Sequence, residues 1–483
     1  MDNTYKKVDL KLILAIVATG LMSFSGVVVE TAMNVTFPTL MRQFQIGTSA
    51  VQWITTGYLL VLAVIIPASS FLKKRFTTKA LFIAADLCFI AGTILAAFTP
   101  NFALLLVGRL IQGMGTGIAL PLMFNIVLEQ VPASKLGLMM GVASLITAAA
   151  PAVGPSLGGW IVTHFGWRMI FMALLPILLL ALVMGSACIR QVTAVERVRF
   201  DWLGYGLLAV SFASFIFAAS LAGTKGWLSF PVLGCFALSA ATILLFYQHS
   251  RKTAAPIIQL DIFGCKPFVL SVLVLVLVQF ICLGLSFLIP NYAQLTAGAD
   301  PFAAGCLLLP GCILGALLAP FGGKLFDRFG AKKPILFGNG CILTAMLCYS
   351  IWAERLSLLM FLIFYIAFAV GQGFSVGNTM TNGLKQLPER LNADGNAVIN
   401  TLQQLAGAIG TSVVTTLVAA EQAKLSEDLA QATMLGSQKA FLLLCTLAVL
   451  ILVCSLGVFR SSMPKKNAAR WRENRQVMLD KQR

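Results

Sequence analysis

The chain has 483 residues, of which 58% are hydrophobic and only 11% are charged. So few polar side chains cannot cover the surface of a soluble globule of this size. The composition therefore excludes a soluble protein and predicts an integral membrane protein. The formal net charge of +17 could suggest a nucleic-acid partner, but the distribution of the charges along the chain argues against one.

Fourteen apolar runs follow one another, each long enough to cross a hydrocarbon core of ~30 Å as a helix. The runs are residues 11–38, 50–72, 78–98, 102–128, 136–163, 168–190, 202–223, 229–248, 267–290, 302–322, 334–352, 356–383, 395–420 and 440–459. The sequence therefore predicts an all-α membrane protein with both termini on one side.

The basic residues fix the expected orientation. With the N-terminus placed in the cytosol, 28 of the 35 Lys and Arg fall in cytosolic segments, 6 fall outside and Arg109 alone lies within a span. This is the positive-inside pattern, and it predicts a multi-pass membrane protein with cytosolic termini. We expect the basic tail, residues 461–483, to bind anionic lipids of the inner leaflet. A regulatory partner of the tail is the alternative.

Span 1 contains a carboxylate, Glu30, within the apolar stretch that Pro38 closes. An ionised side chain deep in a bilayer costs roughly 2.5 kcal/mol or more, so acids there usually face a cavity or a partner and mark an ion path. Asn34 follows one turn later on the same face. Glu30 is therefore the candidate proton-coupling residue. The alternative is a neutral acid that ties two helices together.

Two more charges lie in the first half. Arg109 of span 4 and Glu30 each lie about eight residues, ~12 Å, from the outer ends of their spans. If these spans are neighbours, the two charges can pair or share a water, which would make the burial of each tolerable. Asp86 of span 3 lies in the inner leaflet, either near the interface or against a neighbouring helix, and is a second candidate for proton coupling.

Span 5 combines prolines with small residues in Gly154-Pro155-x-x-Gly158-Gly159. Each proline removes a helical hydrogen bond, and the glycines permit close helix contact. We expect a bent helix pressed against another one, as a conformational pivot or as a purely structural kink.

An internal repeat divides the chain. Pro38 and Pro290 are separated by an offset that recurs, with slow drift, for other pairs such as Gly137 and Gly395. The repeat implies two six-span bundles in the same orientation. Many secondary transporters consist of two such parallel halves, with the binding site between them. The predicted domains are an N-terminal bundle (1–192), a linker with two additional spans (193–262), a C-terminal bundle (263–460) and the tail.

The loop after span 10 contains Gly323, Asp327, Arg328 and Gly330. Its glycines permit a tight turn, and its charges can cap helix ends and pair across the loop, so we expect a latch that stabilises one conformation. A plain basic loop is the alternative. In the first half Lys74 stands where the motif would place an Asp, so a latch there is less well supported.

Amides replace acids in spans 12 and 13. They either line a cavity or bond helix to helix. The predicted cavity residues are Asn34, Trp53, Tyr58, Gln372, Asn378, Asn400 and Gln403. No metal or disulfide pattern is expected, because the two His lie far apart in the chain and the eleven Cys never form C-x-x-C. No nucleophile with a base is offered either, so an enzyme is not expected.

Several motifs resemble those of the major facilitator superfamily, and in particular its fourteen-span drug:proton antiporters, the EmrB and QacA group. The matching motifs are Gly154-Pro155-x-x-Gly158-Gly159, Arg109 with Gly113 and Gly117, Gly323 to Lys333, and Asp201-Trp202-x-Gly204. Glu30, which follows Val29 at the position where many members carry Asp, and Gln52-Trp53-x-x-Thr56-Gly57-Tyr58 are most similar to a branch related to lincomycin exporters.

The resemblance implies the major facilitator fold and a proton-coupled exporter of lipophilic small molecules, located in the bacterial plasma membrane, that confers antibiotic resistance. We expect neutral or monocationic substrates, the proton gradient as energy source without a cofactor, and a monomer. The alternatives are a proton-coupled importer or a uniporter and, outside transport, a membrane sensor or scaffold.

Overall fold

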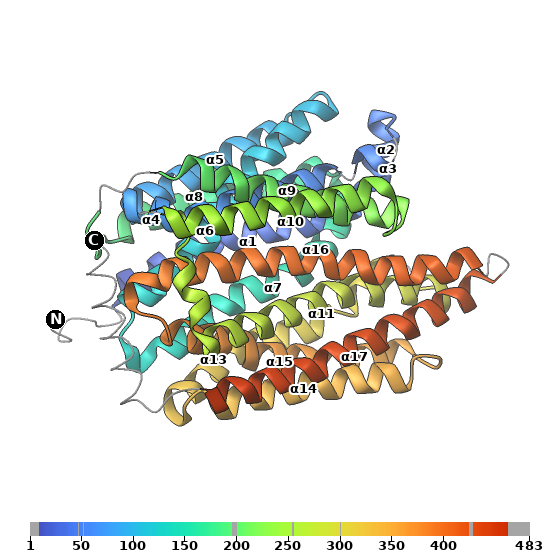
Figure 1. The fold of residues 1–483 in the computed structure, drawn as a ribbon. Coiled ribbons are helices and arrows are strands. Elements are labelled where there is room, and N and C mark those ends of the chain that lie inside the picture. Colours follow the sequence, from blue (N-terminus) through green and yellow to red (C-terminus); the bar gives the residue numbers. More distant parts are fainter. Residues whose placement is uncertain are drawn as a thin grey trace.

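The structure is a computed structural model that describes residues 9–46, 48–51, 53–195, 200–253, 256–299, 301–424 and 428–461. The described part of the chain is helical throughout, without strands, and fourteen of its helices are long and apolar enough to cross a membrane. They run roughly alongside one another (Figure 1). The end of the bundle where α1 begins and α17 ends is called the terminal face below. The predicted basic tail lies beyond the described residues except for Ser461.

The helices form two groups of six with a pair between them in the chain. The first group is α1 (Leu10–Val35), α4 (Trp53–Arg75), α5 (Thr78–Ala97), α6 (Phe102–Gln130), α7 (Leu136–Phe165) and α8 (Arg168–Cys188). The pair is α9 (Trp202–Lys225) and α10 (Phe230–Lys252). The second group is α11 (Lys266–Ala297), α13 (Leu309–Phe329), α14 (Lys332–Ile351), α15 (Leu358–Lys385), α16 (Asn392–Lys424) and α17 (Leu429–Ser461). Short elements are α2 (Phe37–Phe44), α3 (Thr48–Val51), α12 (Pro301–Cys306), η2 (Ala133–Lys135), η3 (Leu260–Gly264) and η4 (Glu389–Leu391).

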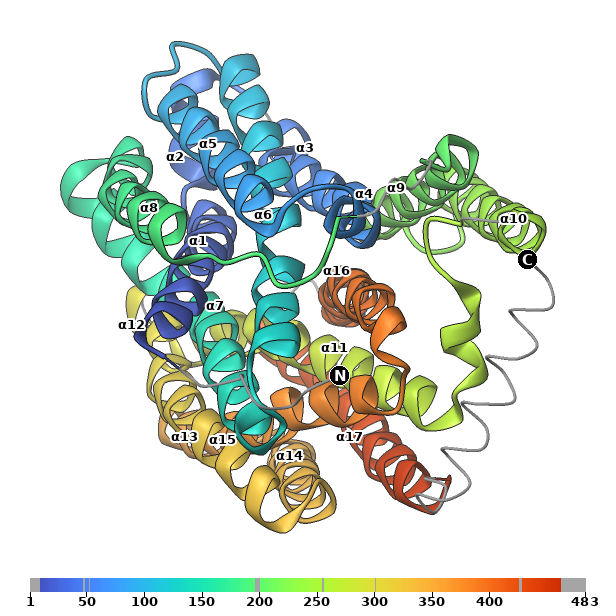
Figure 2. The ribbon, with the colours of Figure 1, turned by 90° about the vertical axis from the view of Figure 1, so that its left-hand side faces the viewer.

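Contacts between the two groups concentrate on a few helices. α7 of the first group packs against α13 and α15, and α16 of the second packs against α4 and α6. The view along the helices shows α7 and α16 near the middle of the molecule, with α9 and α10 at one side (Figure 2). α9 packs against α4 and α16, whereas α10 packs mainly against α9. The space between the two groups is therefore lined mainly by helices that carry the polar residues singled out in the sequence.

Each predicted span except span 10 corresponds to one long helix, but some predicted ends are wrong. Pro290 does not end its span, because α11 continues through it to Ala297. The last span begins at Leu429 rather than at 440 because its first turns are polar yet helical. Predicted span 10 consists of two helices, α12 and α13, since the chain turns before Pro310. Prolines here lie inside helices, as Pro67 and Pro290 do, or in first turns, as Pro310 does, so a proline alone does not mark a helix end.

Candidate functional site

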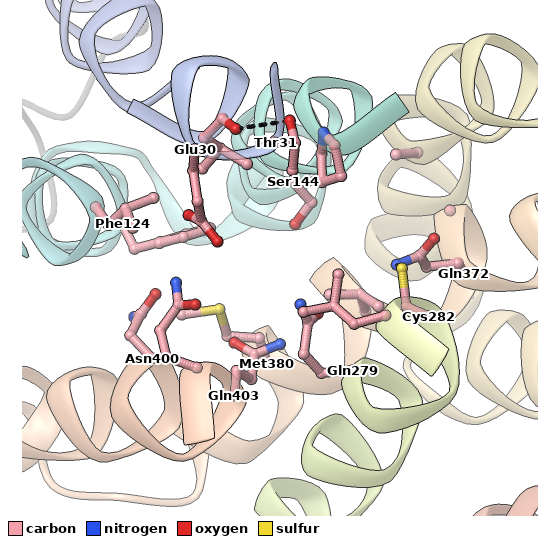
Figure 3. Close-up of a pocket in the computed structure, with 18 residues that line it drawn as sticks. Glu30, Thr31, Phe124, Ser144, Gln279, Cys282, Gln372, Met380, Asn400 and Gln403 are labelled. Atoms are coloured by element: carbon pink, nitrogen blue, oxygen red, sulfur yellow. Dashed lines mark hydrogen bonds between the residues drawn. The ribbon is translucent and has the colours of Figure 1, made fainter. Parts of the chain in front are cut away.

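A cavity lies between the two groups of helices (Figure 3). α1, α6 and α7 form one wall, and α11, α13, α15 and α16 form the other. Its polar lining is chemically asymmetric: the first group contributes one acid and two hydroxyls, whereas the second contributes only amides and a thiol. These residues are Glu30, Thr31 and Ser144 on one wall, and Gln279, Cys282, Gln372, Asn400, Gln403 and Gln404 on the other. Among the described residues that line it, Glu30 is the only acid.

Glu30 lies on α1 and points into the cavity toward the wall that holds Asn400 (Figure 3). Its side chain is half-buried, and no hydrogen bond or ion pair joins it to another described residue. Asn400 instead donates to Asn396 on its own helix, at 2.9 Å to the backbone oxygen and 2.8 Å to Oδ1. The Glu30 carboxyl group is thus free to take up a proton or to bind a ligand.

The position of α1 depends on glycines of α7. A Cβ added to Gly158 would lie 2.8 Å from the Cβ of Ala32, closer than side chains tolerate. Gly154 meets Thr31 in the same way, one turn earlier on α7. The close helix contact predicted for span 5 is therefore present, and its partner is the helix of Glu30. Pro151 and Pro155 lie inside α7, and Gly159 is half-buried beside them.

Arg109 lies on α6 and is fully buried. α1 and α6 are neighbours, as the depth argument required. Arg109 nevertheless forms no ion pair with Glu30 in the described chain. Its Nη1 donates to Gln112 Oε1 at 2.9 Å, and its Nε donates to the carbonyl oxygen of Ile54 at 3.4 Å. Its guanidinium carbon lies 4.2 Å from the ring centre of Tyr58, so an aromatic ring takes the position expected for a carboxylate.

Asp86 lies on α5, packed between α6 and α8, and is fully buried. Neither of its carboxylate oxygens has a hydrogen-bond partner among the described residues. α5 contributes no residue to the cavity lining. The structure therefore does not bring Asp86 together with Glu30.

Four predicted cavity residues lie outside the described lining. Asn34 is exposed and accepts a hydrogen bond from Thr55 at 2.8 Å. Trp53 packs its ring against Phe217 of α9. Tyr58 is fully buried beneath Arg109. Asn378 faces away.

Asn378 shows why the sequence placed it wrongly. Its Nδ2 donates to the carbonyl oxygen of Phe374 in its own helix at 2.8 Å, and its side chain packs near Gly322 of α13. This amide donates within its own helix, which is neither the cavity position nor the bond between helices that the sequence analysis considered. Gln372, Asn400 and Gln403 do line the cavity.

Sequence reasoning missed several lining residues, among them Gln279 and Cys282 of α11. Gln279 is the only amide between Lys266 and Pro290, and that isolation in an apolar run was a usable signal. Cys282 accepts a hydrogen bond from Gln372 at 3.4 Å, which no sequence pattern indicates. Phe124 and Met380 contribute apolar surface.

A polar contact joins the two groups at the terminal face. Asp327, at the end of α13, accepts the backbone N–H of Gly137 at 2.9 Å and of Leu138 at 3.0 Å. These are the first N–H groups of α7, which have no intrahelical partner and carry the positive end of the helix dipole. Gly323, one turn before Asp327, packs directly against Gly137. The loop motif thus caps a helix of the other half.

The other two residues of that motif act locally. Arg328 stacks on the ring of Phe329, with its guanidinium carbon 5.2 Å from the ring centre. Gly330 ends α13 with a φ of +82°, a conformation that side chains other than glycine rarely adopt.

A second contact joins the groups on the other side of the same face. Lys74, at the end of α4, forms an ion pair with Asp394 at the start of α16, with 3.2 Å between Nζ and Oδ2. Ser70 donates to the other oxygen of Asp394, which is fully buried. By the repeat offset, Lys74 corresponds to Asp327, so the two contacts have opposite charges at equivalent positions. The first-half loop therefore does contact the other half, although it lacks the motif Asp.

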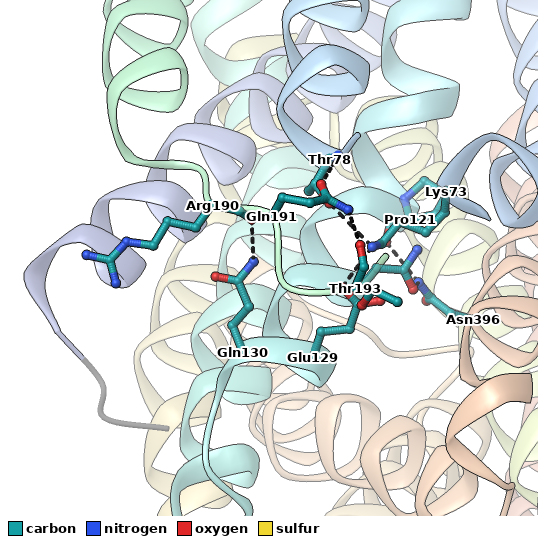
Figure 4. Close-up of polar contacts among 10 residues, drawn as sticks. Lys73, Thr78, Pro121, Glu129, Gln130, Arg190, Gln191, Thr193 and Asn396 are labelled. Carbon is teal, nitrogen blue, oxygen red and sulfur yellow. Dashed lines mark hydrogen bonds and ion pairs between the residues drawn. The ribbon is translucent and has the colours of Figure 1, made fainter. Parts of the chain in front are cut away.

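Further polar contacts tie the first group together at this face (Figure 4). Lys73 is buried and pairs with Glu129 of α6 at 2.8 Å. The segment after α8 is held by Gln191, which accepts the backbone N–H of Thr78 at 2.7 Å. One further contact joins the two groups: Asn396 of α16 donates to the carbonyl oxygen of Pro121, which lies inside α6, at 2.8 Å.

Comparisons with known proteins agree with this architecture. The model of the Major Facilitator Superfamily matches residues 19–411, most of the chain. The chain belongs to the Major Facilitator Superfamily. This transporter is 36% identical to lincomycin resistance protein LmrB of Listeria monocytogenes, covering 92% of this chain and 96% of the relative. It is 30% identical to the multidrug resistance protein B homolog of Mycobacterium tuberculosis, covering 80% of this chain and 73% of the relative.

A solved structure with the same fold is that of the proton:xylose symporter XylE. Its TM-score is 0.62 at 14% identity, and the match covers 94% of this chain and 96% of that one. At this identity the likeness concerns the fold alone. The fourteen-span major facilitator fold and the resemblance to lincomycin exporters, both predicted from the sequence, are confirmed. The transporter is a multi-pass protein of a bacterial membrane.

Proposed function

We propose that the protein is a proton-driven exporter of lipophilic small molecules that works by alternating access. The observation that carries this proposal is the unpartnered Glu30 carboxyl group in a cavity between two halves of a transporter. The names of the relatives, which refer to lincomycin and multidrug resistance, support export of drugs. The terminal face is the cytosolic face in this proposal, as the distribution of Lys and Arg favours.

Glu30 carries the proton. It takes up a proton when the cavity faces outward and releases it when the cavity faces the cytosol, and substrate leaves to the outside in exchange. Arg109, on the neighbouring helix α6, supplies a cation whose effect on Glu30 differs between the two conformations. The gradient alone supplies energy, no cofactor takes part, and one chain suffices. Asp86 stays a candidate for a second proton site.

The lining predicts the substrate class. A dication in a low-dielectric cavity needs more than one carboxylate, because an unpaired charge there is costly. The described lining offers Glu30 alone, and the proton cycle uses it. The amides of α11, α15 and α16 offer hydrogen bonds, and Phe124 and Met380 offer apolar contact. We therefore infer neutral or singly charged, partly aromatic substrates.

Transport into inverted membrane vesicles tests the proposal. With an acid interior, vesicles that contain the protein should accumulate lincomycin or the monocation ethidium, and a protonophore should abolish the accumulation. A rigid dication should accumulate less than its monocationic analogue. Accumulation that needs the opposite gradient would indicate an importer, and accumulation indifferent to the gradient would indicate a uniporter. Either result would overturn the proposal.

A further inference from the structure

The connection between Arg109 and the helix of Glu30 runs through Tyr58. The guanidinium carbon of Arg109 lies 4.2 Å from the centre of the Tyr58 ring. At its other end, the Tyr58 hydroxyl lies 3.0 Å from the carbonyl oxygen of Gly26 on α1 and 2.8 Å from Thr116 Oγ1 on α6. Gly26 precedes Glu30 by four residues, one helical turn on the same face. Tyr58 thus contacts the cation at its ring and the helix of the acid at its hydroxyl.

This junction is tightly packed. Tyr58 and Arg109 are both fully buried. A Cβ added to Gly26 would lie 2.5 Å from Thr116 Oγ1, so only a glycine lets α1 approach α6 here. The ring of Tyr58 is therefore fixed on both sides and cannot move without displacing α1 or Arg109.

Arg109 and Glu30 can each form further hydrogen bonds. The Nη2 of Arg109 has no hydrogen-bond partner among the described residues, and Glu30 has none either. Opposite charges in a low-dielectric site attract strongly and pair when geometry permits. Glu30 and Arg109 are close enough for the charge of each to act on the other, and the neutral Tyr58 lies near both. Within the described lining of the cavity, Cys282 is the only other titratable group. The facing groups of α15 and α16 are neutral amides.

We propose that Tyr58 is a positioning residue that holds Arg109 away from Glu30, so that the carboxyl group can exchange its proton. The ring occupies one face of the guanidinium, and the hydroxyl fixes the ring to α1. This inference rests on the proposed role of Glu30 and adds a residue that sets the strength of its interaction with Arg109. Without the ring, the guanidinium moves to the carboxylate and stabilises the ionised form.

The experiment measures protonation of Glu30 directly in the purified full-length protein. Infrared difference spectroscopy follows the carboxyl C=O band against pH, and the band is assigned by its loss in Glu30→Gln. In Tyr58→Leu, half-protonation should need about tenfold more protons than in the unchanged protein, which is one pH unit. Tyr58→Phe keeps the ring on Arg109, so its shift should be clearly smaller. Tyr349→Phe, which removes a buried hydroxyl bonded to the carbonyl oxygen of Phe361, should leave the band unchanged.

A double variant separates positioning from a merely structural effect. If Tyr58 acts through Arg109, Tyr58→Leu should leave the titration unaltered in an Arg109→Gln background. The same shift in both backgrounds, or no shift in either, would overturn the inference. Failure of the proposed function gives a different result: Glu30→Gln would still transport with a pH gradient, whatever Tyr58 does to the infrared band.

Discussion

The acid and the cation of the first half lie on neighbouring helices, but they are not paired. Glu30 faces a cavity, whereas Arg109 is bound by Gln112, by Ile54 and by the ring of Tyr58. An unpaired buried charge costs several kcal/mol unless other groups solvate it. The two residues should therefore respond differently to substitution.

Glu30→Gln mimics the protonated acid and keeps its shape. We expect accumulation driven by a pH gradient in inverted vesicles to fall at least tenfold, while equilibrium binding of ethidium changes little, because the hydrogen-bonding geometry of the cavity persists. The measurement pairs vesicle transport with binding to the purified protein. Transport that persists unchanged in the variant would remove Glu30 from the mechanism.

Arg109 should need both its charge and its planar shape. Arg109→Ala leaves Gln112 and the carbonyl oxygen of Ile54 without their donor and removes the ring contact with Tyr58, so transport should be lost and stability should fall by about 2 kcal/mol or more. Arg109→Lys keeps the charge but not the fork, so partial transport is expected. The variants are compared by vesicle transport and thermal unfolding across pH. Identical behaviour of Ala, Lys and Arg at this position would contradict the prediction.

At the scale of elements, the contact between α1 and α7 sets where Glu30 lies. α7 presents Gly154 and Gly158 to α1 at distances that leave no room for a side chain. Inside a bilayer the hydrophobic effect does not drive helices together, because lipid tails are as apolar as the side chains. Close backbone contact of this kind is therefore a main source of helix association. Any displacement of α1 moves the carboxyl group relative to the amides on the opposite wall.

Gly158→Ala should therefore impair transport. The added methyl would lie 2.8 Å from the Cβ of Ala32, so α1 must move, at a cost of about 1–3 kcal/mol. A matched control is Gly340→Ala on α14, where an added Cβ meets no atom within 4 Å. Vesicle transport and thermal unfolding should change in the first variant and stay as they are in the second. Equal effects in both would show that helix propensity, and not the contact, decides the outcome.

At the scale of the whole molecule, two contacts that involve charged side chains join the halves at the terminal face, besides the hydrogen bond of Asn396 with Pro121. One is the carboxylate of Asp327 on the first N–H groups of α7, and the other is the ion pair of Lys74 with the buried Asp394. Asp327 and Lys74 lie at equivalent positions of the repeat, yet the first is acidic and the second is basic. Alternating access requires both to break when the cavity opens toward this face.

Removing either contact should loosen this face. Asp327→Ala should speed hydrogen exchange at Gly137 and Leu138, whose N–H groups lose their acceptor. Lys74→Ala leaves Asp394 buried without its cation and should speed exchange at the start of α16. Mass spectrometry of peptides from the purified protein reads both segments. Arg328→Ala, which removes a contact with Phe329 only, serves as the control. Unaltered exchange in the first two variants would mean that neither contact holds the face closed.

The sequence predicted the spans, the repeat and the acid of the cavity because each follows from a local pattern. Hydropathy marks helices, and an isolated polar residue such as Glu30 stands out against apolar neighbours. Whether Asn378 faces a cavity or its own backbone depends on how its helix is rotated about its axis relative to its neighbours. This rotation cannot be predicted from a single sequence. The same holds for Tyr58, which lies under Arg109 rather than in the cavity, and for Lys74, whose partner Asp394 is 320 positions away.

The two halves repeat each other, but the surface that they present to the bilayer does not. α9 covers the junction of α4 and α16, where Ala63, Ile216 and Leu405 form a small apolar cluster, and α10 adds another layer outside it. The contact of α7 with α13 lies elsewhere on the molecule, where the short α12 packs against both helices and neither α9 nor α10 does. On one side of the protein, α9 and α10 thus lie between the surrounding lipid and a contact of the two halves. A compound dissolved among the acyl chains therefore meets two additional helices on that side and neither of them on the other.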